Sequence, residues 1–267
     1  MKDKDATSKI DTNKLLQMIS SCHLGGVIDE CVLNINEGTG EIQAVDITNS
    51  LIFLGKIKKI TRNNISGEYG LGDLGLLIKF LGSMREETTT FKPKRRYLEF
   101  KRKDGRKKVN YLLTEPDMVS TKLDETDEKK DKKSVEGKLL KDTTVHIDIT
   151  DSFINSFITN INMLSSKDVL IRYDGDEGVQ FICGTENEHQ INLLIEDGVE
   201  GDEGEEVDLR LNGEHLFSIL SIIKATKGND DPVSIHFEDQ RPVVIKSGSI
   251  TWSLIPLIST YNGDEGE

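Results

Sequence analysis

Three glycines, Gly70, Gly72 and Gly75, have the spacing of a phosphate-binding loop that opens a helix. In a dinucleotide site, such glycines let the backbone approach a pyrophosphate at the helix N-terminus. The residues before them do not read as a buried parallel strand, and Asp73 would place a carboxylate where the pyrophosphate belongs. We therefore expect no nucleotide at this loop and no cofactor elsewhere.

Metal and nucleophile chemistry have little support. Cys22, Cys31 and Cys183 lack the paired spacing of a zinc site or a disulfide framework, so we expect all three in the core. The five histidines lie in strand or helix patterns, without the context of a nucleophile elbow. The sequence predicts a protein that binds no metal and is not an enzyme.

The basic residues of the helical segments are the remaining candidates for a functional role. They flank or lie on three of four predicted helices: Lys9, Lys14, Lys79, Arg85, Lys224 and Lys227. A cation at a helix C-terminus complements the helix dipole, which alone would suffice for Arg85, Lys224 and Lys227. Yet residues 143–267 contain only seven basic residues, and two of them lie at one helix end. This placement favours an electropositive strip that holds a polyanion loosely.

The helices that carry these residues come as two repeats. Asp11–Leu24 and Asp151–Leu164 each place a capping residue before apolar positions at helical spacing, 140 positions apart. Leu71–Met84 and Leu211–Thr226 both contain a glycine and an acidic residue near their start and then run Leu-rich, again 140 positions apart. The duplication predicts an α+β protein of two similar domains, each with two helices packed on a mostly antiparallel sheet.

Strand-like segments follow the helices in both halves. Segments 27–35, 41–47 and 51–60 are rich in β-branched residues and predict a meander. Tyr97–Lys103 and Arg106–Leu113 flank Asp104-Gly105, a dipeptide that favours a tight turn, and predict a hairpin. The second half repeats this order, with strands expected at 143–149, 169–173, 179–183, 190–196, 207–211, 233–237, 243–246 and 250–255.

Residues 118–142 separate the repeats and carry mixed charge with few apolar side chains. We expect this segment to be an exposed linker between domains at 1–117 and 143–267, flexible at least over 124–133. Met118 and Val119, at its start, are apolar enough to pack on a domain surface.

The net charge of −13 is unevenly spread, at +4 for residues 1–118, 0 for 119–142 and −17 for 143–267. This asymmetry suits head-to-tail association of copies, although acidic hairpin tips that are merely solvated would also produce it. No apolar run approaches the ~20 residues of a membrane span, and the N-terminal residues lack the apolar region of a signal peptide. We expect a soluble, intracellular protein that makes no membrane contact.

The chain resembles DNA sliding clamps of the proliferating cell nuclear antigen type, including those of tailed phages. Leu211–Thr226 with its Ile-Ile-Lys-Ala-Thr ending, the final strand with its Leu-x-Pro turn, and Leu71–Gly82 carry the resemblance. It implies a duplicated clamp fold and a homotrimeric ring with its helices facing the hole. Such a ring encircles double-stranded DNA without reading sequence, is placed by a clamp loader and serves as a DNA polymerase processivity factor. The implied compartment is the host cytoplasm for a phage protein, and the nucleus or nucleoid otherwise.

Matching positions give Lys14, Lys79 and Lys224 as the leading DNA-facing residues, with Lys9, Arg85 and Lys227 behind them. The partner groove of the family would take an apolar plug from a polymerase, clamp loader or other replication protein. It maps onto Val45, Ile47, Leu51, Met118, Val119, Pro242, Leu254, Ile255 and Pro256.

Two segments with opposite charge also predict a subunit interface. Segments 106–113 and 190–196 both alternate in apolar residues, and an unpaired strand edge invites pairing with another chain. The interface residues would be Arg106, Lys107, Lys108, Val109, Tyr111, Glu188, Ile191, Leu193 and Glu196.

Two alternatives remain open. One is a scaffold or monomeric processivity subunit of the same fold that never encloses DNA. The other is an enzyme built on carboxylates such as Asp148, Asp151 and Asp174, although their spacing gives no reason for them to meet.

Overall fold

The structure is a computed structural model. It describes residues 8–62, 65–84, 89–121, 135–141, 143–164, 167–175, 178–185, 187, 189–201, 206–226 and 231–257. The predicted site residues Arg85, Glu188 and Lys227, and the part of the linker predicted to be most flexible, lie outside these ranges.

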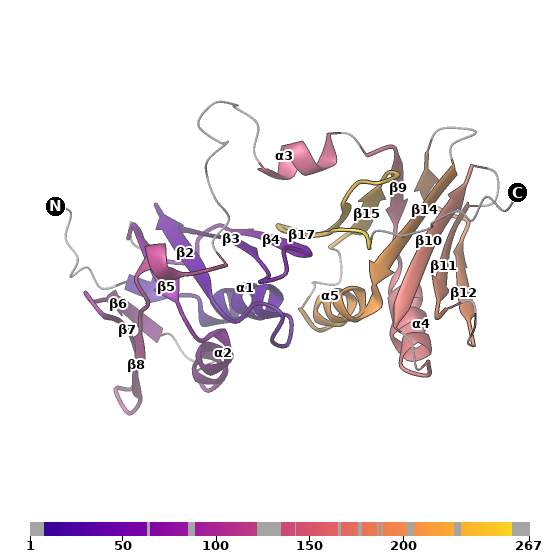
Figure 1. Ribbon diagram of the computed structural model, residues 1–267. Helices are drawn as coiled ribbons and strands as arrows, with labels where there is room; N and C mark the ends of the chain where they lie inside the picture. Colours follow the sequence, from indigo (N-terminus) through magenta and orange to yellow (C-terminus); the bar gives the residue numbers. More distant parts are fainter. Residues whose placement is uncertain are drawn as a thin grey trace, which may run out of the picture.

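Two similar halves follow each other along the chain (Figure 1). The first consists of β1 (Ser8–Ile10), α1 (Thr12–His23), β2 (Cys31–Asn36), β3 (Thr39–Val45), β4 (Leu51–Ile57), β5 (Gly67–Leu71), α2 (Leu74–Gly82), β6 (Thr89–Pro93), β7 (Tyr97–Arg102) and β8 (Lys108–Leu112). A 3-10 turn, η1 (Pro116–Met118), and a short helix, α3 (Val135–Leu140), lie in the segment between the halves.

The second half has the same order with one extra short strand. It consists of β9 (Val145–Asp148), α4 (Asp151–Ile161), β10 (Asp168–Asp174), β11 (Gly178–Cys183), β12 (Ile191–Ile195), β13 (Val199–Glu200), β14 (Glu206–Asn212), α5 (Gly213–Thr226), β15 (Val233–Phe237), β16 (Val243–Ser247) and β17 (Ile250–Leu254). The predicted α+β duplication is confirmed, with helices and strands close to their expected positions.

The strands form three antiparallel sheets, in the orders β1-β6-β7-β8, β12-β11-β10-β14 and β13-β9-β15-β16-β17-β4-β3-β2-β5. The nine-stranded sheet crosses from one half to the other, because β17 pairs with β4. Helices α1, α2, α4 and α5 all lie on one side of the sheets, while α3 lies on the other side (Figure 1). The molecule therefore has a helix-lined face and a sheet face.

Side-chain caps set where the helices begin. The Asp11 carboxylate accepts from Lys14 N at 3.1 Å, and the Asp73 carboxylate accepts from Leu76 N at 2.7 Å. In the third predicted helix the cap is Thr150, not Asp151, since the Thr150 hydroxyl accepts from Phe153 N at 3.2 Å. Asp151 is therefore the first helical residue, where its charge favours the helix dipole.

The glycines of the apparent phosphate loop serve close packing of the chain on itself. A Cβ on Gly70 would come within 2.3 Å of the Thr114 carbonyl oxygen, and one on Gly72 within 2.3 Å of the Thr114 hydroxyl. The Thr114 N–H donates to Gly70 O at 3.0 Å, so the segment that follows β8 pairs with β5 at this point. Residues 67–71 form β5, a strand that the glycine spacing concealed.

The start of the linker packs on the sheet, as expected for Val119, which is 5% exposed. Val45 N donates to Thr121 O at 2.9 Å, and the Ser120 N–H donates to a Glu30 carboxylate oxygen at 2.7 Å. Val135–Leu140, in the second part of the predicted linker, is helical.

Candidate functional surfaces

The helix-lined face carries three of the predicted DNA-facing lysines. Lys79 is exposed on α2 while Leu74, Leu77 and Leu81 point into the core, and Lys224 is exposed on α5. Lys14 lies on α1, with its ammonium 4.0 Å from the Asp11 carboxylate and 44% of its side chain exposed. The three helices that carry these lysines lie on the same side of the sheets (Figure 1).

Helix dipoles explain Lys79 and Lys224, which lie in the last turns of α2 and α5. They do not explain Lys14, because it lies in the first turn of α1, where a cation opposes the dipole. The neighbouring Asp11 offsets part of this cost. Lys14 is therefore the lysine whose position most needs a functional reason.

Lys9 is not part of this face, contrary to the prediction. It lies on β1 between Ser8 and Ile10, which are 2% and 5% exposed and point into the core. Because side chains alternate along a strand, Lys9 points to the opposite, outer side of its sheet. A helix-based interpretation of the sequence placed it beside Lys14, and only the strand β1 reveals its direction.

Around the turn from Asp46 to Ser50, the residues of the predicted partner groove differ in their exposure to solvent. Ile47, Met118 and Ile255 have exposed fractions of 82%, 73% and 42%, and Ile255 N donates to Ser50 O at 2.9 Å. Val45, Pro242 and Pro256 are partly buried. Leu51, Val119 and Leu254 are at most 5% exposed and belong to the interior, so they cannot receive a partner.

Leu257 is an additional exposed apolar residue, 44% exposed, that the sequence interpretation missed. Continuing the alternation of Ile255 beyond the end of β17 would have found it. The turn that carries Ile47 is held by the Asp46 carboxylate, which accepts from Ser50 N and Leu51 N at 2.7 Å each. Burial opposes ionisation of Asp46, but these bonds and those from Thr48 outweigh it and lower its pKa.

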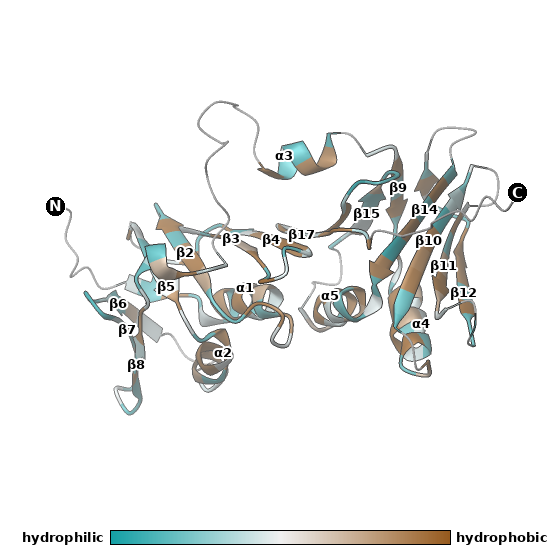
Figure 2. Cartoon of the chain, in the orientation of Figure 1, coloured by the Kyte–Doolittle hydropathy of each residue, from teal (hydrophilic) through white to brown (hydrophobic). Residues whose placement is uncertain are grey.

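The two predicted interface strands lie at sheet edges at opposite ends of the molecule (Figure 1). Among the described residues, β8 pairs with β7 alone, and β12 pairs with β11 alone. A hollow of about 370 Å³ lies between α2 and β8, and one of about 440 Å³ between α4 and β12. Figure 2 shows that α2 is hydrophobic over most of its surface, and Leu76 on it is 39% exposed.

The predicted interface residues differ in their exposure and in the contacts that they already make. Val109, Ile191 and Leu193 are partly exposed on the edge strands, and Arg106 and Glu196 are exposed beside them. The Lys107 ammonium donates to the Ser83 hydroxyl at 2.6 Å, and the Lys108 ammonium lies 2.8 Å from the Glu99 carboxylate.

The prediction that Tyr111 belongs to the subunit interface is wrong. It is 3% exposed, and its hydroxyl donates to Asp73 O at 3.0 Å and accepts from Asp73 N at 2.9 Å. Burial raises the pKa of Tyr111 to about 12, so the hydroxyl stays protonated and joins β8 to the start of α2.

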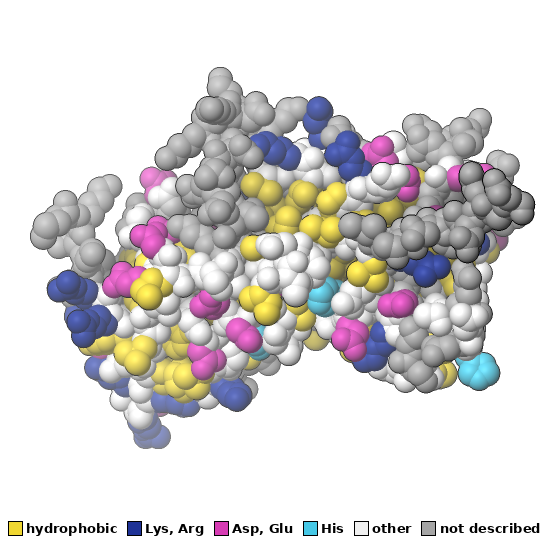
Figure 3. Space-filling model, viewed as in Figure 1, with side chains coloured by type: hydrophobic (Ala, Val, Ile, Leu, Met, Phe, Trp, Pro, Cys, Tyr) yellow, Lys and Arg dark blue, Asp and Glu magenta, His cyan; other side chains and the backbone are white. Residues whose placement is uncertain are grey.

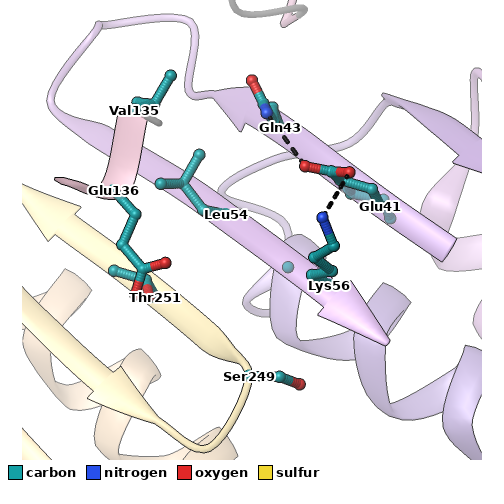
Figure 4. A pocket seen from close by; sticks show the side chains of 10 residues that line it. Glu41, Gln43, Leu54, Lys56, Val135, Glu136, Ser249 and Thr251 are labelled. Carbon is teal, nitrogen blue, oxygen red and sulfur yellow. Dashed lines mark hydrogen bonds and ion pairs between the residues drawn. The ribbon is translucent and has the colours of Figure 1, made fainter. Parts of the chain in front are cut away.

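On the sheet face, α3 covers the line where the two halves meet. The Glu136 carboxylate lies 2.8 Å from the Lys246 ammonium and accepts from the Thr251 hydroxyl at 3.4 Å. A cavity of about 390 Å³ lies beneath α3, and the Lys56 ammonium at its edge is 3.5 Å from the Glu41 carboxylate. Figure 4 shows this ion pair and the neighbouring Leu54. The lining alternates in charge and gives no convergent set of groups for chemistry.

Two findings concern what the described residues lack. Within them, no helix combines the length and the apolar character that a bilayer crossing requires. The same part of the chain contains no group of three or more His, Cys, Asp or Glu side chains arranged to hold a metal ion.

No protein-family model matches the sequence, and no curated protein matches it. Solved structures of sliding clamps match the fold. Proliferating cellular nuclear antigen (PCNA) from Entamoeba histolytica superposes with a TM-score of 0.71 at 12% identity, over 94% of this chain and 98% of that chain. A. fulgidus PCNA bound to the C-terminal region of FEN-1 gives 0.71 at 17%, over 96% and 100%. The PCNA2-PCNA3 complex from Sulfolobus tokodaii gives 0.67 at 14%, over 94% and 99%.

These superpositions extend over nearly the whole chain, so the match includes both halves and the junction between them. The chain has the fold of the PCNA-type DNA sliding clamps, as the resemblance in sequence predicted.

Proposed function

We propose that this protein is a DNA sliding clamp, a non-catalytic ring of three copies that encircles duplex DNA and tethers a DNA polymerase and other replication proteins. The observation that supports this proposal best is the repetition of one strand junction. Within the chain, β17 of the second half pairs with β4 of the first. By the repeat, β8 is the counterpart of β17 and β12 is the counterpart of β4, and both are sheet edges in the part of the chain that the structure describes.

Internal equivalence gives the register of the proposed junction. Ser8 and Ile147 each lie three residues before a helix cap and pair with Phe91 and Ile235, so those two positions correspond. Across the first sheet, Phe91 is the Cα partner of Phe100, and Phe100 is the partner of Val109. In the second half, Ile235 is the partner of Ile245, and Ile245 is the partner of Trp252. Val109 therefore takes the place of Trp252.

The other edge follows by the same route. Cys31 and Val169 are each the eighth residue after the preceding helix, so Leu33 corresponds to Ile171. In the first half, Leu33 is the Cα partner of Ile42, and Ile42 is the partner of Gly55. In the second half, Ile171 is the partner of Phe181, and Phe181 is the partner of Leu193. Gly55 therefore corresponds to Leu193, and Phe53, two residues earlier, corresponds to Ile191. Since Trp252 and Phe53 are Cα partners, we expect Val109 of one copy to lie opposite Ile191 of the next.

The half-buried state of these strands supports the same arrangement. Val109 and Leu193 pack against the core of their own halves, and a partner strand would complete their burial. The edge of β8 is flanked by Arg106 and Lys107, while Glu196 follows β12, so charges of opposite sign would meet.

Cross-linking tests the ring and its register together. A variant with both Val109→Cys and Ile191→Cys should form a covalent trimer under mild oxidation, while each single variant should not. The native cysteines are buried and should stay unlinked. Val109→Cys combined with Leu194→Cys is the matched control, because Leu194 points to the other face of β12.

Native mass spectrometry of the unmodified protein decides between a ring and a monomeric scaffold. We expect a trimer, and the fraction of the protein that is trimeric should rise with protein concentration. A protein that stays monomeric at high concentration and gives no cross-linked species would exclude the ring, and a closed-circle retention assay would then have no basis.

A further inference from the structure

The sheet β1-β6-β7-β8 has one face toward the core and one toward solvent. Ile10, Phe91, Phe100 and Tyr111 are buried on the inner face, with exposed fractions of 5% or less. Because strands alternate, the residues between them form the outer face, on the side away from the helices. This outer face plays no part in the proposed encirclement of DNA.

One row of cations crosses this outer face from strand to strand. Lys9 is the Cα partner of Thr90, Thr90 of Lys101, and Lys101 of Lys108. On the other side of Lys9, the Arg62 N–H donates to Lys9 O at 3.0 Å, which adds a fourth cation to the row. With neighbouring strands about 4.8 Å apart, the row extends over roughly 20 Å.

A second row extends the same charge. Lys92 is the Cα partner of Glu99, and Lys94 N donates to Tyr97 O at 2.9 Å beyond it. Glu99 is the acidic residue of this face, and its hydrogen bond with Lys108 is the main cause of its lowered pKa. The face thus carries Arg62, Lys9, Lys92, Lys94, Lys101 and Lys108 against Glu99. Figure 3 shows Lys and Arg side chains gathered at this end of the molecule.

This arrangement costs the free protein some stability. Lys101 and Lys108 are direct cross-strand partners, and like charges in that position repel each other. The Glu99 carboxylate forms an ion pair with Lys108 and so offsets its charge. Lys9, Arg62 and Lys101 have no ion pair with any residue that the structure describes. Solubility gives no reason for such a face in a protein of net charge −13.

We propose that this outer face binds a single strand of nucleic acid through its phosphates, at a site separate from the helix-lined face. A phosphate backbone supplies the repeated negative charges that a row of cations across several strands can contact. Lysines act as point charges without bidentate geometry, which suits binding that is independent of sequence. Tyr97, partly exposed on the same face, offers a ring on which an unpaired base can stack.

An acidic protein fits this face less well. Stable protein interfaces are built around buried apolar or aromatic anchors, whereas charged residues are depleted from their centres. Here lysines occupy the centre, and the exposed apolar residue Leu112 lies at the end of β8, opposite Tyr97. The composition therefore matches a polyanion.

Fluorescence anisotropy of a labelled oligothymidylate with the full-length protein tests the proposal. The double variant Lys9→Gln/Lys101→Gln should lose at least about tenfold in affinity at low salt. The slope of log affinity against log salt should fall by about 1.4, at about 0.7 for each phosphate of a single strand that is no longer neutralised. Lys56→Gln/Lys138→Gln removes the same charge from two exposed lysines outside both proposed nucleic-acid surfaces, and should leave oligothymidylate affinity within about twofold.

Tyr97→Leu separates stacking from charge, since it should lower affinity at least about fivefold without changing the salt slope. Thermal melts of all variants should show intact folding. Equal losses in both double variants, an unchanged Lys9→Gln/Lys101→Gln protein, or wild-type protein that binds no oligothymidylate at low salt would each overturn the proposal. The site does not depend on ring formation, so a monomeric protein should bind the oligonucleotide equally well.

Discussion

Trp252 and Phe53 meet edge to face where the two halves of the chain join, with ring centroids 6.0 Å apart and ring planes at 61°. The Trp252 indole N–H also donates to Ser21 O on α1 at 3.0 Å. One side chain of the last strand thus contacts both β4 and α1 of the first half. The pair is therefore one of the side-chain contacts that join the two halves, together with Leu51 and Leu254.

Removing the Trp252 side chain should be costly. Trp252 is 1% exposed, and truncating a buried Trp to Ala typically costs about 3 to 5 kcal/mol. We expect Trp252→Ala to lower the free energy of unfolding by that amount in urea titrations and to lower the unfolding midpoint. Trp252→Phe keeps most of the volume and should cost less. A decrease below about 1 kcal/mol for the Ala variant would mean that the other contacts across the junction hold the halves together without Trp252.

His236 should make stability depend on pH. It stacks on His146 with ring centroids 4.4 Å apart, and burial, assisted by His146 and Lys246, lowers the pKa of His236 to about 4. An unfolded His titrates near a pKa of about 6.5, so between about pH 6.5 and 4 the unfolded state binds more protons. Stability should fall as pH is lowered through that window.

His236→Gln should flatten this part of the pH profile of unfolding free energy. His189→Gln is the matched control, because His189 is exposed and its variant should follow the wild-type curve. Parallel curves for the wild type and His236→Gln over this range would contradict the assignment.

The sequence predicted the repeat well, because its signals are local. Apolar periodicity and the caps Asp11 and Asp73 lie within a few residues of the helices that they define. The hairpin of β7 and β8 was visible from Asp104-Gly105, and Gly105 has the expected positive φ of 71°. These features need no knowledge of distant parts of the chain.

The sites were predicted less well, because burial and direction are set by distant partners. Leu51 and Leu254 looked available beside the linker, but they are Cα partners across the β4–β17 junction and belong to the core. Tyr111 was predicted to be an exposed edge residue, but its hydroxyl donates to the backbone oxygen of Asp73, which is far away in sequence. The direction of Lys9 depended on a three-residue strand that pairs with β6.

The exposed apolar residues around the Asp46–Ser50 turn should bind partner proteins. Ile255→Asp should abolish stimulation of the replicative polymerase of the same genome and leave the native mass unchanged, because Ile255 is 42% exposed and its replacement leaves the core intact. Met163→Asp serves as a control, since Met163 is 69% exposed at the end of α4. Full stimulation by the Ile255→Asp protein would move the partner site elsewhere.

Lys14, Lys79 and Lys224 should hold duplex DNA loosely, through screened interactions with phosphates. Changing all three to Ala should shorten residence on closed circular DNA after loading, and the salt slope for duplex binding should fall by about 0.9 for each phosphate that is no longer neutralised. Trimer mass and partner binding should not change, because the three side chains point away from the core. If Lys79 and Lys224 only complement helix dipoles, their removal should instead cost about 0.3 to 1 kcal/mol of stability each and leave residence unchanged.

Lys14→Ala alone separates the two explanations most clearly. In the first turn of α1 its charge opposes the dipole, so the dipole explanation predicts unchanged or slightly higher stability on its removal. Phosphate binding predicts a measurable decrease in residence on closed circles for the same protein. Thermal melts of this single variant therefore test the dipole explanation, and retention assays test phosphate binding independently. Unchanged retention in both the single and the triple variant would leave the helix-lined face without a role in holding DNA.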